Sequence, residues 1–187
     1  FYAGMANAYC KEHNLPILEA QAAQVMGQVY FWKGDQEAAR NLFENARKKL
    51  EKAKASPDLI AESFLELAYL ERQTQNYNAA LELALNIRKL YQGNDSLEKH
   101  PVIFSKVLAL QGSIFEDLGS YDLAIEYFTE SIDICKANKD TNGLSDMYSR
   151  IGNVRYLMGE NDLALQTYED ALELERIKGN RMGEMMS

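Results

Sequence analysis

The sequence predicts an all-α protein built from stacked helical hairpins, and three observations support this prediction. Only three of the 187 residues are proline, which suits a chain dominated by helices. Apolar residues recur at helical spacing, for example at Leu144, Met147, Ile151 and Val154. A pattern of small and aromatic residues also recurs four times, at a period of roughly 40 residues, which indicates a repeat architecture.

The clearest hairpin runs from Gly143 to Arg176. Gly152 lies in the apolar face of its first helix, where the missing side chain lets a second helix approach closely. Gly159 is predicted to end that helix, because glycine readily adopts the left-handed conformation of a helix C-terminus. The second helix is expected to place Ala164 against Gly152 and to fill the contact with an aromatic ring.

Gly152 serves as the position marker of the repeat, and its counterparts in the earlier hairpins are Gly27, Ala68 and Gly112. Positions in each hairpin are counted from its marker. An alanine stands at position +12, a ring or an alanine at position +16, and a turn residue at position +7. These three sets are Ala39, Ala80, Ala124 and Ala164; Phe43, Ala84, Phe128 and Tyr168; and Gly34, Gln75, Gly119 and Gly159.

The register predicts the bounds of each repeat and of its helices. Residues 1–187 are predicted to form a single array. Residues 1–13 are expected to be the second helix of a preceding repeat, because Cys10 and Cys135 both stand at position −17 from the marker that follows them. Four full repeats are expected at 18–54, 58–91, 102–138 and 143–177. Their helices are predicted at 18–32, 36–54, 58–73, 78–91, 102–118, 121–137, 143–158 and 162–177. Residues 179–187 are predicted to start a further, truncated repeat.

The segments Met26-Gly27-x-x-Tyr30 and Ala39-x-x-x-Phe43 resemble the tetratricopeptide repeat (TPR), as do their counterparts around Gly112. Glu71, Ala84 and Arg155 depart from the aromatic pattern, and no repeat ends in the usual proline. Longer second helices then explain the long period.

The long repeats are similar to those of the Leu-Gly-Asn spindle-orientation protein, of rapsyn, and of ciliary and axonemal TPR proteins. This resemblance implies an α-solenoid that winds into a right-handed superhelix. It also implies a cytoplasmic scaffold or adaptor associated with the cytoskeleton or with cilia, in a larger chain or complex.

Charge and motifs argue against several functional classes. The net charge of −8 disfavours nucleic acid and anionic lipid as the main partner, and no apolar run approaches the ~20 residues of a membrane span. His13 and His100 lie in predicted turns without nearby ligands, so we expect no metal site. Cys10 and Cys135 are too far apart along the array for a disulfide, and we predict neither a cofactor nor an enzyme activity.

The TPR resemblance places four positions of each first helix in a concave groove: −6, −3, +1 and +4 from the marker. Amides among them suit the backbone of an extended peptide, and rings suit apolar anchors. The expected groove positions are Gln21, Gln24, Gln28, Phe31, Glu62, Leu65, Tyr69, Arg72, Lys106, Ala109, Ser113, Glu116, Asp146, Ser149, Asn153 and Tyr156. The predicted partner contacts among them are Gln24, Gln28, Phe31, Tyr69, Arg72, Lys106, Ser113, Asn153 and Tyr156.

Three functions remain open at this point. The first is a protein-binding scaffold that holds an extended segment or a helix of a partner. The second is a chaperone adaptor with a carboxylate clamp, for which Arg72, Lys106 and Asn153 have suitable chemistry. The third is the ligand domain of a peptide-sensing regulator of the bacterial kind. A groove occupied by flanking repeats or by water is the alternative to all three.

Overall fold

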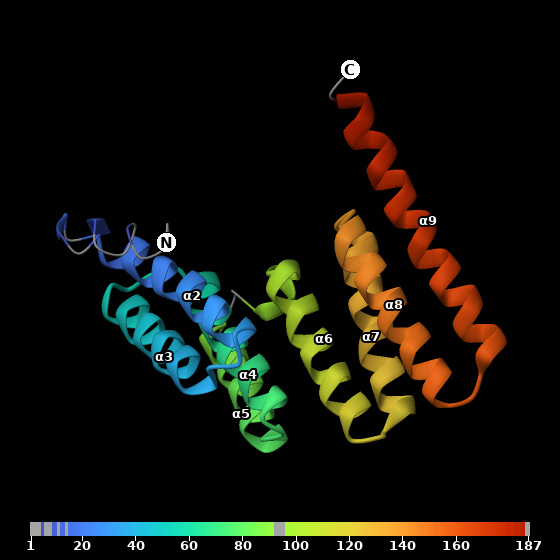
Figure 1. Cartoon of the computed structure of the whole chain (residues 1–187), viewed down its shortest axis with the longest axis horizontal. Helices are drawn as coiled ribbons and strands as arrows, with labels where there is room; N and C mark the ends of the chain where they lie inside the picture. The colour runs from blue at the N-terminus through green and yellow to red at the C-terminus, as the bar shows by residue number, and fades with distance from the viewer. Residues whose placement is uncertain (1–4, 6–8, 11, 14, 92–95, 186–187) are drawn as a thin grey trace. The chain divides into compact units, whose positions relative to one another are not determined.

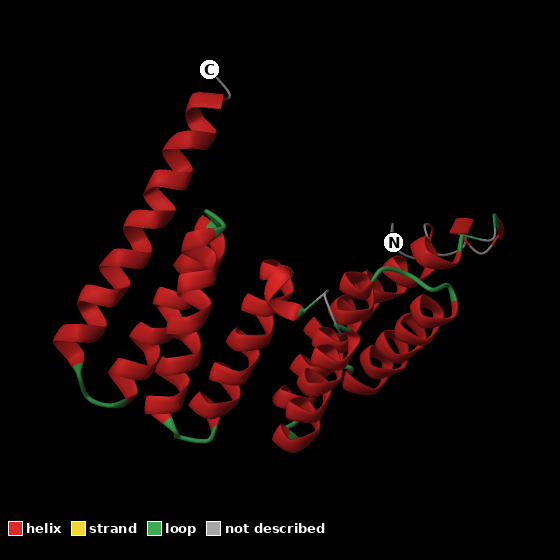
Figure 2. Cartoon of the chain, turned by 180° about the vertical axis from the view of Figure 1, so that it is seen from behind, coloured by secondary structure: helices red, strands yellow, loops and turns green. Residues whose placement is uncertain are grey.

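The computed structural model describes residues 5, 9–10, 12–13, 15–91 and 96–185, with the backbone alone at 178 and 180–185. These residues form eight α-helices, one short 3-10 helix and no strand, which confirms the all-α prediction (Figures 1 and 2). The elements are α2 (Pro16–Trp32), α3 (Gln36–Lys52), α4 (Pro57–Gln73), α5 (Tyr77–Leu90), η1 (Leu97–Lys99), α6 (Pro101–Asp117), α7 (Tyr121–Ala137), α8 (Thr141–Leu157) and α9 (Asn161–Met185).

The helices pack as four antiparallel hairpins: α2 with α3, α4 with α5, α6 with α7, and α8 with α9. The chain divides into two compact units, Phe1–Ser96 and Leu97–Ser187, hereafter unit 1 and unit 2. Within unit 1 the hairpins meet where α3 packs on α4, and within unit 2 where α7 packs on α8. The helical-repeat fold is thus confirmed, while the single superhelical array stays a prediction.

The first helices of the hairpins start at well-defined signals. All three prolines open such helices, at Pro16, Pro57 and Pro101, where the missing N–H is not needed for a helical hydrogen bond. The fourth first helix, α8, uses Asp140 as its N-cap, and the Asp140 carboxylate accepts a hydrogen bond of 3.0 Å from the Gly143 N–H. Equivalent helices therefore start with different residues, a proline in three hairpins and an Asp N-cap in the fourth.

The turn between the two helices of each hairpin contains a residue in the left-handed conformation. Gly34, Gly119 and Gly159 have φ angles of 80°, 73° and 80°, as the register predicts. Gln75 takes the same conformation at φ 61°, although it carries a side chain. The turn position thus dictates the backbone conformation even where glycine is absent.

The helix at the C-terminal end is longer than predicted, and the helix predicted at the N-terminal end is described only in part. The helix expected to end at Ile177 continues as α9 to Met185. No proline or left-handed residue interrupts it, and Gly179 keeps the helical backbone. The further repeat proposed for residues 179–187 stays a prediction. Most of residues 1–13 lie outside the described residues, although Cys10 is helical and buried.

Each glycine marker is in contact with the aromatic ring at position +16. A Cβ atom added to Gly27, Gly112 or Gly152 would lie 2.5, 2.6 or 2.7 Å from Cε1 of Phe43, Phe128 or Tyr168, respectively. The ring therefore lies directly on the helix backbone. The three atoms nearest to that position at Gly152 all belong to Tyr168, which confirms that a ring fills the contact, while the seating of Ala164 against Gly152 stays a prediction.

The second hairpin uses a different combination of volumes at these two positions. Its marker is Ala68, and Ala84 replaces the ring; both are buried. One added methyl group at the marker thus accompanies the loss of a ring at the partner position. The two positions act as a pair whose combined volume has to suit the gap between the helices.

The alanine at position +12 is buried in every hairpin, with Ala39, Ala80 and Ala124 fully inaccessible to solvent. We expect Ala124→Leu to destabilise the protein by about 1–3 kcal/mol, because three extra carbon atoms would overpack the α6–α7 contact. Chemical denaturation measures this loss. Ala137→Leu, at an exposed alanine of the same helix, should leave the midpoint nearly unchanged. Equal midpoints for both variants would contradict the assigned register.

Glu71 occupies position +3, where the TPR pattern has an aromatic residue, and is only 7% exposed. One of its carboxylate oxygens accepts a hydrogen bond from the Arg40 guanidinium of α3, and the other accepts one of 3.0 Å from the Asn76 amide. The hydrogen bond from Arg40 is the main cause that lowers the pKa of Glu71, against the opposing effect of burial. An ion pair thus links α3 and α4.

Candidate functional site

Hydrogen bonds between side chains connect neighbouring first helices at equivalent positions in the two units. In unit 1 the Gln28 amide of α2 donates to the Glu66 carboxylate of α4 at 2.7 Å. In unit 2 the Arg150 guanidinium of α8 donates to the Ser113 hydroxyl of α6 at 2.8 Å. Both bonds join position +1 of one hairpin to position −2 of the next. The bridge therefore has the same position in the repeat in both units, whereas the residue types that form it differ.

These bridges change how two of the predicted partner contacts must be interpreted. Ser113 is only 1% exposed, so its hydroxyl lies inside unit 2 beneath Arg150. Gln28 is exposed, but its amide is already bonded to Glu66. Ser113 therefore has little direct access to a partner, because a long side chain from the next first helix covers it.

Arg150 is a site residue that the sequence analysis missed. Its Nε donates to the Asp146 carboxylate at 3.0 Å, and its guanidinium carbon lies 6.0 Å from the centre of the Phe128 ring. In both units the register places polar residues at the two bridged positions, namely Gln28 with Glu66 and Ser113 with Arg150. This recurrence in the sequence could have predicted the bridge. Position −2 of each hairpin belongs to this surface as well.

Asn153 and Tyr156 lie further along α8. The side-chain oxygen of Asn153 accepts a hydrogen bond of 2.6 Å from the hydroxyl group of Tyr168 on α9. This bond orients the exposed amide and leaves its NH₂ group available as a donor. Tyr156 is 64% exposed, which is high for an aromatic ring.

Asp146, Arg150, Asn153 and Tyr156 together form what we call the α8 stripe. Their spacing of three or four residues places them along one side of the helix. The stretch from Asp146 to Tyr156 spans about 15 Å at the rise of an α-helix. This length matches about four or five residues of an extended peptide. The stripe offers, in order, a carboxylate, a guanidinium, an amide and a ring.

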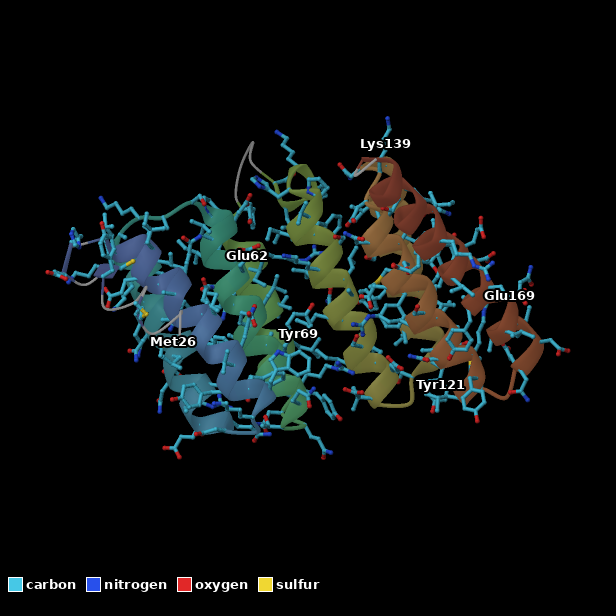
Figure 3. The ribbon with its side chains drawn as sticks, turned by 45° about the horizontal axis from the view of Figure 1, so that its top comes forward. Met26, Glu62, Tyr69, Tyr121, Lys139 and Glu169 are labelled. Atoms are coloured by element: carbon cyan, nitrogen blue, oxygen red, sulfur yellow. The ribbon has the colours of Figure 1, made fainter. Side chains whose placement is uncertain are left out.

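The other predicted contacts are less exposed. Gln24 and Phe31 on α2 are half-buried, and Phe31 packs on the cluster around Phe43 and meets Trp32 edge to face at 6.0 Å. Tyr69 and Arg72 on α4 and Lys106 on α6 are half-buried, and each also interacts with other residues of the protein. The side chain of Tyr69 is labelled in Figure 3.

The described residues hold no cluster of His, Cys, Asp or Glu suited to a metal ion. Cys10 and Cys135 are buried and not paired with each other. Burial is the main cause that raises the pKa of Cys135, and the nearby Asp140 carboxylate adds to it, so this thiol is less readily ionised than a free cysteine. Across the part of the chain with described structure, no helix combines the length and apolar character that membrane crossing requires.

Comparison with known proteins agrees with the repeat pattern. Residues 105–176 match the family described as Tetratricopeptide repeat. Among curated proteins, the chain is 31% identical over 118 residues to Response regulator aspartate phosphatase A of Bacillus subtilis (strain 168), covering 63% of this chain and 28% of the relative. It is 31% identical over 77 residues to human G-protein-signaling modulator 1, covering 41% of this chain and 11% of that protein. The chain therefore spans less than a third of either relative.

Two solved structures share the fold at low sequence identity. BtubC (BKLC) from P. vanneervenii superposes with a TM-score of 0.75 at 19% identity, covering 94% of this chain and 71% of that one. The Rap conjugation gene regulator of the plasmid pLS20, solved in complex with the Phr* peptide, gives a TM-score of 0.72 at 18% identity, covering 88% and 44%. With the register, the left-handed turns and the glycine–ring contacts, these findings show a chain of TPR-like helical hairpins, of which residues 105–176 match the tetratricopeptide-repeat family.

Proposed function

We propose that this chain is a non-enzymatic module that binds a segment of a protein partner along the first helices of its hairpins. The observation that supports this most directly is the α8 stripe, where an oriented amide and a largely exposed ring lie on one rigid helix. The corresponding first-helix residues Gln24, Phe31 and Tyr69 extend the proposal to unit 1.

Each member of the α8 stripe has a separate role in this proposal. The Asn153 amide can donate to a backbone carbonyl of an extended peptide, and the Tyr168 hydroxyl keeps that amide from rotating. The Tyr156 ring supplies an apolar surface of the kind that dominates binding energy at interfaces. Arg150 is held by Asp146, Ser113 and Phe128, so it presents its charge with little remaining freedom. Such preorganisation lowers the entropic cost of binding.

A peptide-sensing regulator is the second candidate function. The pLS20 Rap regulator with a similar fold was solved with the Phr* peptide bound, which supports a short peptide as the ligand here. The phosphatase in the name of the Bacillus relative is not carried over, because this chain spans 28% of that protein. In this version of the proposal, peptide binding to the repeats would control another part of a longer chain.

The carboxylate clamp has weaker support. It requires basic side chains that converge on an acidic terminus, yet Arg72 and Lys106 are half-buried, interact within the protein and belong to different units. A clamp also predicts steep salt dependence, whereas the α8 stripe carries one acidic and one basic residue and predicts mild salt dependence. Association with the cytoskeleton or with cilia stays a prediction from the resemblance.

The experimental test begins with a displayed library of random peptides selected on the purified chain. The best peptide is then titrated against Asn153→Ala and Tyr156→Ala. We expect each substitution to weaken binding by about 1 kcal/mol or more, because each removes an anchor from the middle of the contact. The stability of both variants should change by about 0.5 kcal/mol or less, since both sites are exposed.

Glu169→Ala is the matched control, because Glu169 lies on the exposed side of α9 and outside the stripe (Figure 3). It should bind the selected peptide like the unchanged protein. Equal affinities for all three variants would place the binding surface elsewhere. A steep loss of affinity with added salt would favour the clamp over the proposed stripe.

A further inference from the structure

Three helices of unit 1 line a cavity of about 300 Å³ on the side of the second helices. It lies where α3 and α5 flank α4. Charged side chains dominate its α3 wall, while α4 adds a ring and a carboxylate and α5 adds an amide. The lining residues are Arg40, Glu44 and Arg47 on α3, Phe64, Leu67 and Glu71 on α4, and Leu83 and Asn86 on α5.

Unit 2 shows that repeat packing does not require the two arginines. By the repeat register, Ile125 and Ile132 of α7 stand where Arg40 and Arg47 stand in α3. Both isoleucines contact the apolar cluster between α7 and α8, and Ile132 is 4% exposed. The same seam between hairpins is thus closed by aliphatic side chains in unit 2 and lined by guanidinium groups in unit 1.

The arginines are held in place but keep donor capacity. Arg40 donates to Glu71, which is itself fixed by Asn76. Arg47 donates to Glu51 at 2.7 Å, and its guanidinium carbon lies 5.2 Å from the centre of the Phe64 ring. A guanidinium carries five N–H donors, so most of them remain for a ligand.

The acidic residues of the cavity wall are already compensated. Glu71 has hydrogen-bond donors on both of its oxygens, and Glu44 faces the Lys48 ammonium at 3.6 Å. The Asn86 oxygen accepts from Lys89 at 3.0 Å, which leaves the NH₂ group of Asn86 as a donor. The remaining hydrogen-bonding capacity of the wall is therefore mainly that of donors, beside the apolar surface of Phe64.

We propose that this cavity binds a carboxylate group that sits next to an apolar group, as in an acidic or C-terminal residue of a partner peptide. Guanidinium forks match the two oxygens of a carboxylate, and Arg47 stacked on Phe64 is preoriented for this contact. The volume is at the lower end of ligand pockets and suits one side chain. This second site is independent of the function proposed for the α8 stripe.

The probe is 3-phenylpropanoate, titrated into the ¹⁵N-labelled chain at low salt and followed by two-dimensional NMR. We expect a dissociation constant of about 1 mM, with shifts concentrated on α3, α4 and α5. The net charge of −8 disfavours non-specific uptake of anions, which makes a localised response informative. The neutral 3-phenylpropanamide should bind at least about fivefold more weakly, since it lacks the charge that strengthens a hydrogen bond.

Arg47→Ile is the decisive variant, because unit 2 tolerates isoleucine at the equivalent position. It should weaken binding of 3-phenylpropanoate about tenfold, the loss expected when one charged hydrogen-bonding partner is removed. Lys52→Ala removes the same charge from an exposed residue of the same helix that does not line the cavity, and should leave binding unchanged. Arg40→Ile combined with Glu71→Gln tests the other arginine without stranding a buried carboxylate.

Two further probes identify the source of the carboxylate. N-acetylphenylalanine offers a terminal carboxylate, and the amidated dipeptide N-acetyl-Glu-Phe-amide offers only a side-chain one. Cavity binding by either probe supports the proposal and names the source. Unchanged binding in Arg47→Ile, equal binding of acid and amide, tighter binding of 3-phenylpropylamine, or no response up to about 10 mM would each overturn it.

Discussion

Phe128→Ala is expected to destabilise the protein by about 3–5 kcal/mol, the cost of removing a fully buried ring from a packed contact. The ring lies directly on the helix backbone at Gly112. Gly112→Ala alone is also expected to destabilise, by about 1–2 kcal/mol, because the resulting overpacking exceeds the gain in helix propensity. The added methyl group would lie 2.6 Å from the ring.

The two substitutions together should cost less than the sum of the separate losses, by about 1–2 kcal/mol. Without the ring, the methyl group added at position 112 no longer clashes and fills part of the gap. This double variant reproduces the pair at Ala68 and Ala84, which the second hairpin already uses. Urea denaturation of the four proteins gives the coupling energy. Tyr156→Ala, which removes an exposed ring, controls for loss of an aromatic residue alone.

Strict additivity of the two losses would show that the ring and the glycine do not share the same space. In that case the correspondence between the second hairpin and the others would have no packing basis. A coupling below about 0.3 kcal/mol counts as additive, since independent sites usually agree within that margin.

Arg40→Ala is expected to destabilise the protein by about 2–4 kcal/mol at neutral pH, because it strands the buried Glu71 carboxylate. The Asn76 amide still donates to that carboxylate, which keeps the loss below the upper range for a broken buried pair. Lys48→Ala on the same helix removes an exposed charge and should change stability by less than about 0.5 kcal/mol. Adding Glu71→Gln to Arg40→Ala should recover part of the loss.

The pH dependence of this effect has a defined sign. The pKa of Glu71 is lowered in the folded protein, so its stabilisation is complete above the unfolded pKa of about 4.3 and is lost as the pH falls through the folded value. The stability difference between the unchanged protein and Arg40→Ala should therefore shrink on acidification. A difference that stays constant from neutral to strongly acidic pH would exclude the ion pair as its cause.

The repeat register predicted which sequence positions belong to the site, but it did not predict which side chains contact one another there. The register identified Asn153 and Tyr156, and the structure places both on the exposed side of α8. It did not identify Arg150, whose role depends on reaching Ser113 on the preceding first helix, 37 residues earlier in the chain. Such contacts depend on the length and direction of a side chain between two helices, and spacing within one helix does not contain that information.

By itself, the sequence determined the all-α class, the four hairpins, their register and the left-handed turns at Gly34, Gly119 and Gly159. These features follow from local rules: helical periodicity, prolines at helix starts and the backbone freedom of glycine at helix ends. Each rule acts within a few consecutive residues, so the amino-acid order is sufficient to apply it.

Only the tertiary structure decided which side chains meet between helices. It placed the Phe128 ring on the backbone at Gly112, buried Ser113 beneath Arg150, and paired Arg40 with Glu71 across 31 residues. It also left a cavity in unit 1 where unit 2 is filled by isoleucine. The physical reason is that volume and charge are balanced between partners on different helices, and that balance is reached only when the hairpins pack together.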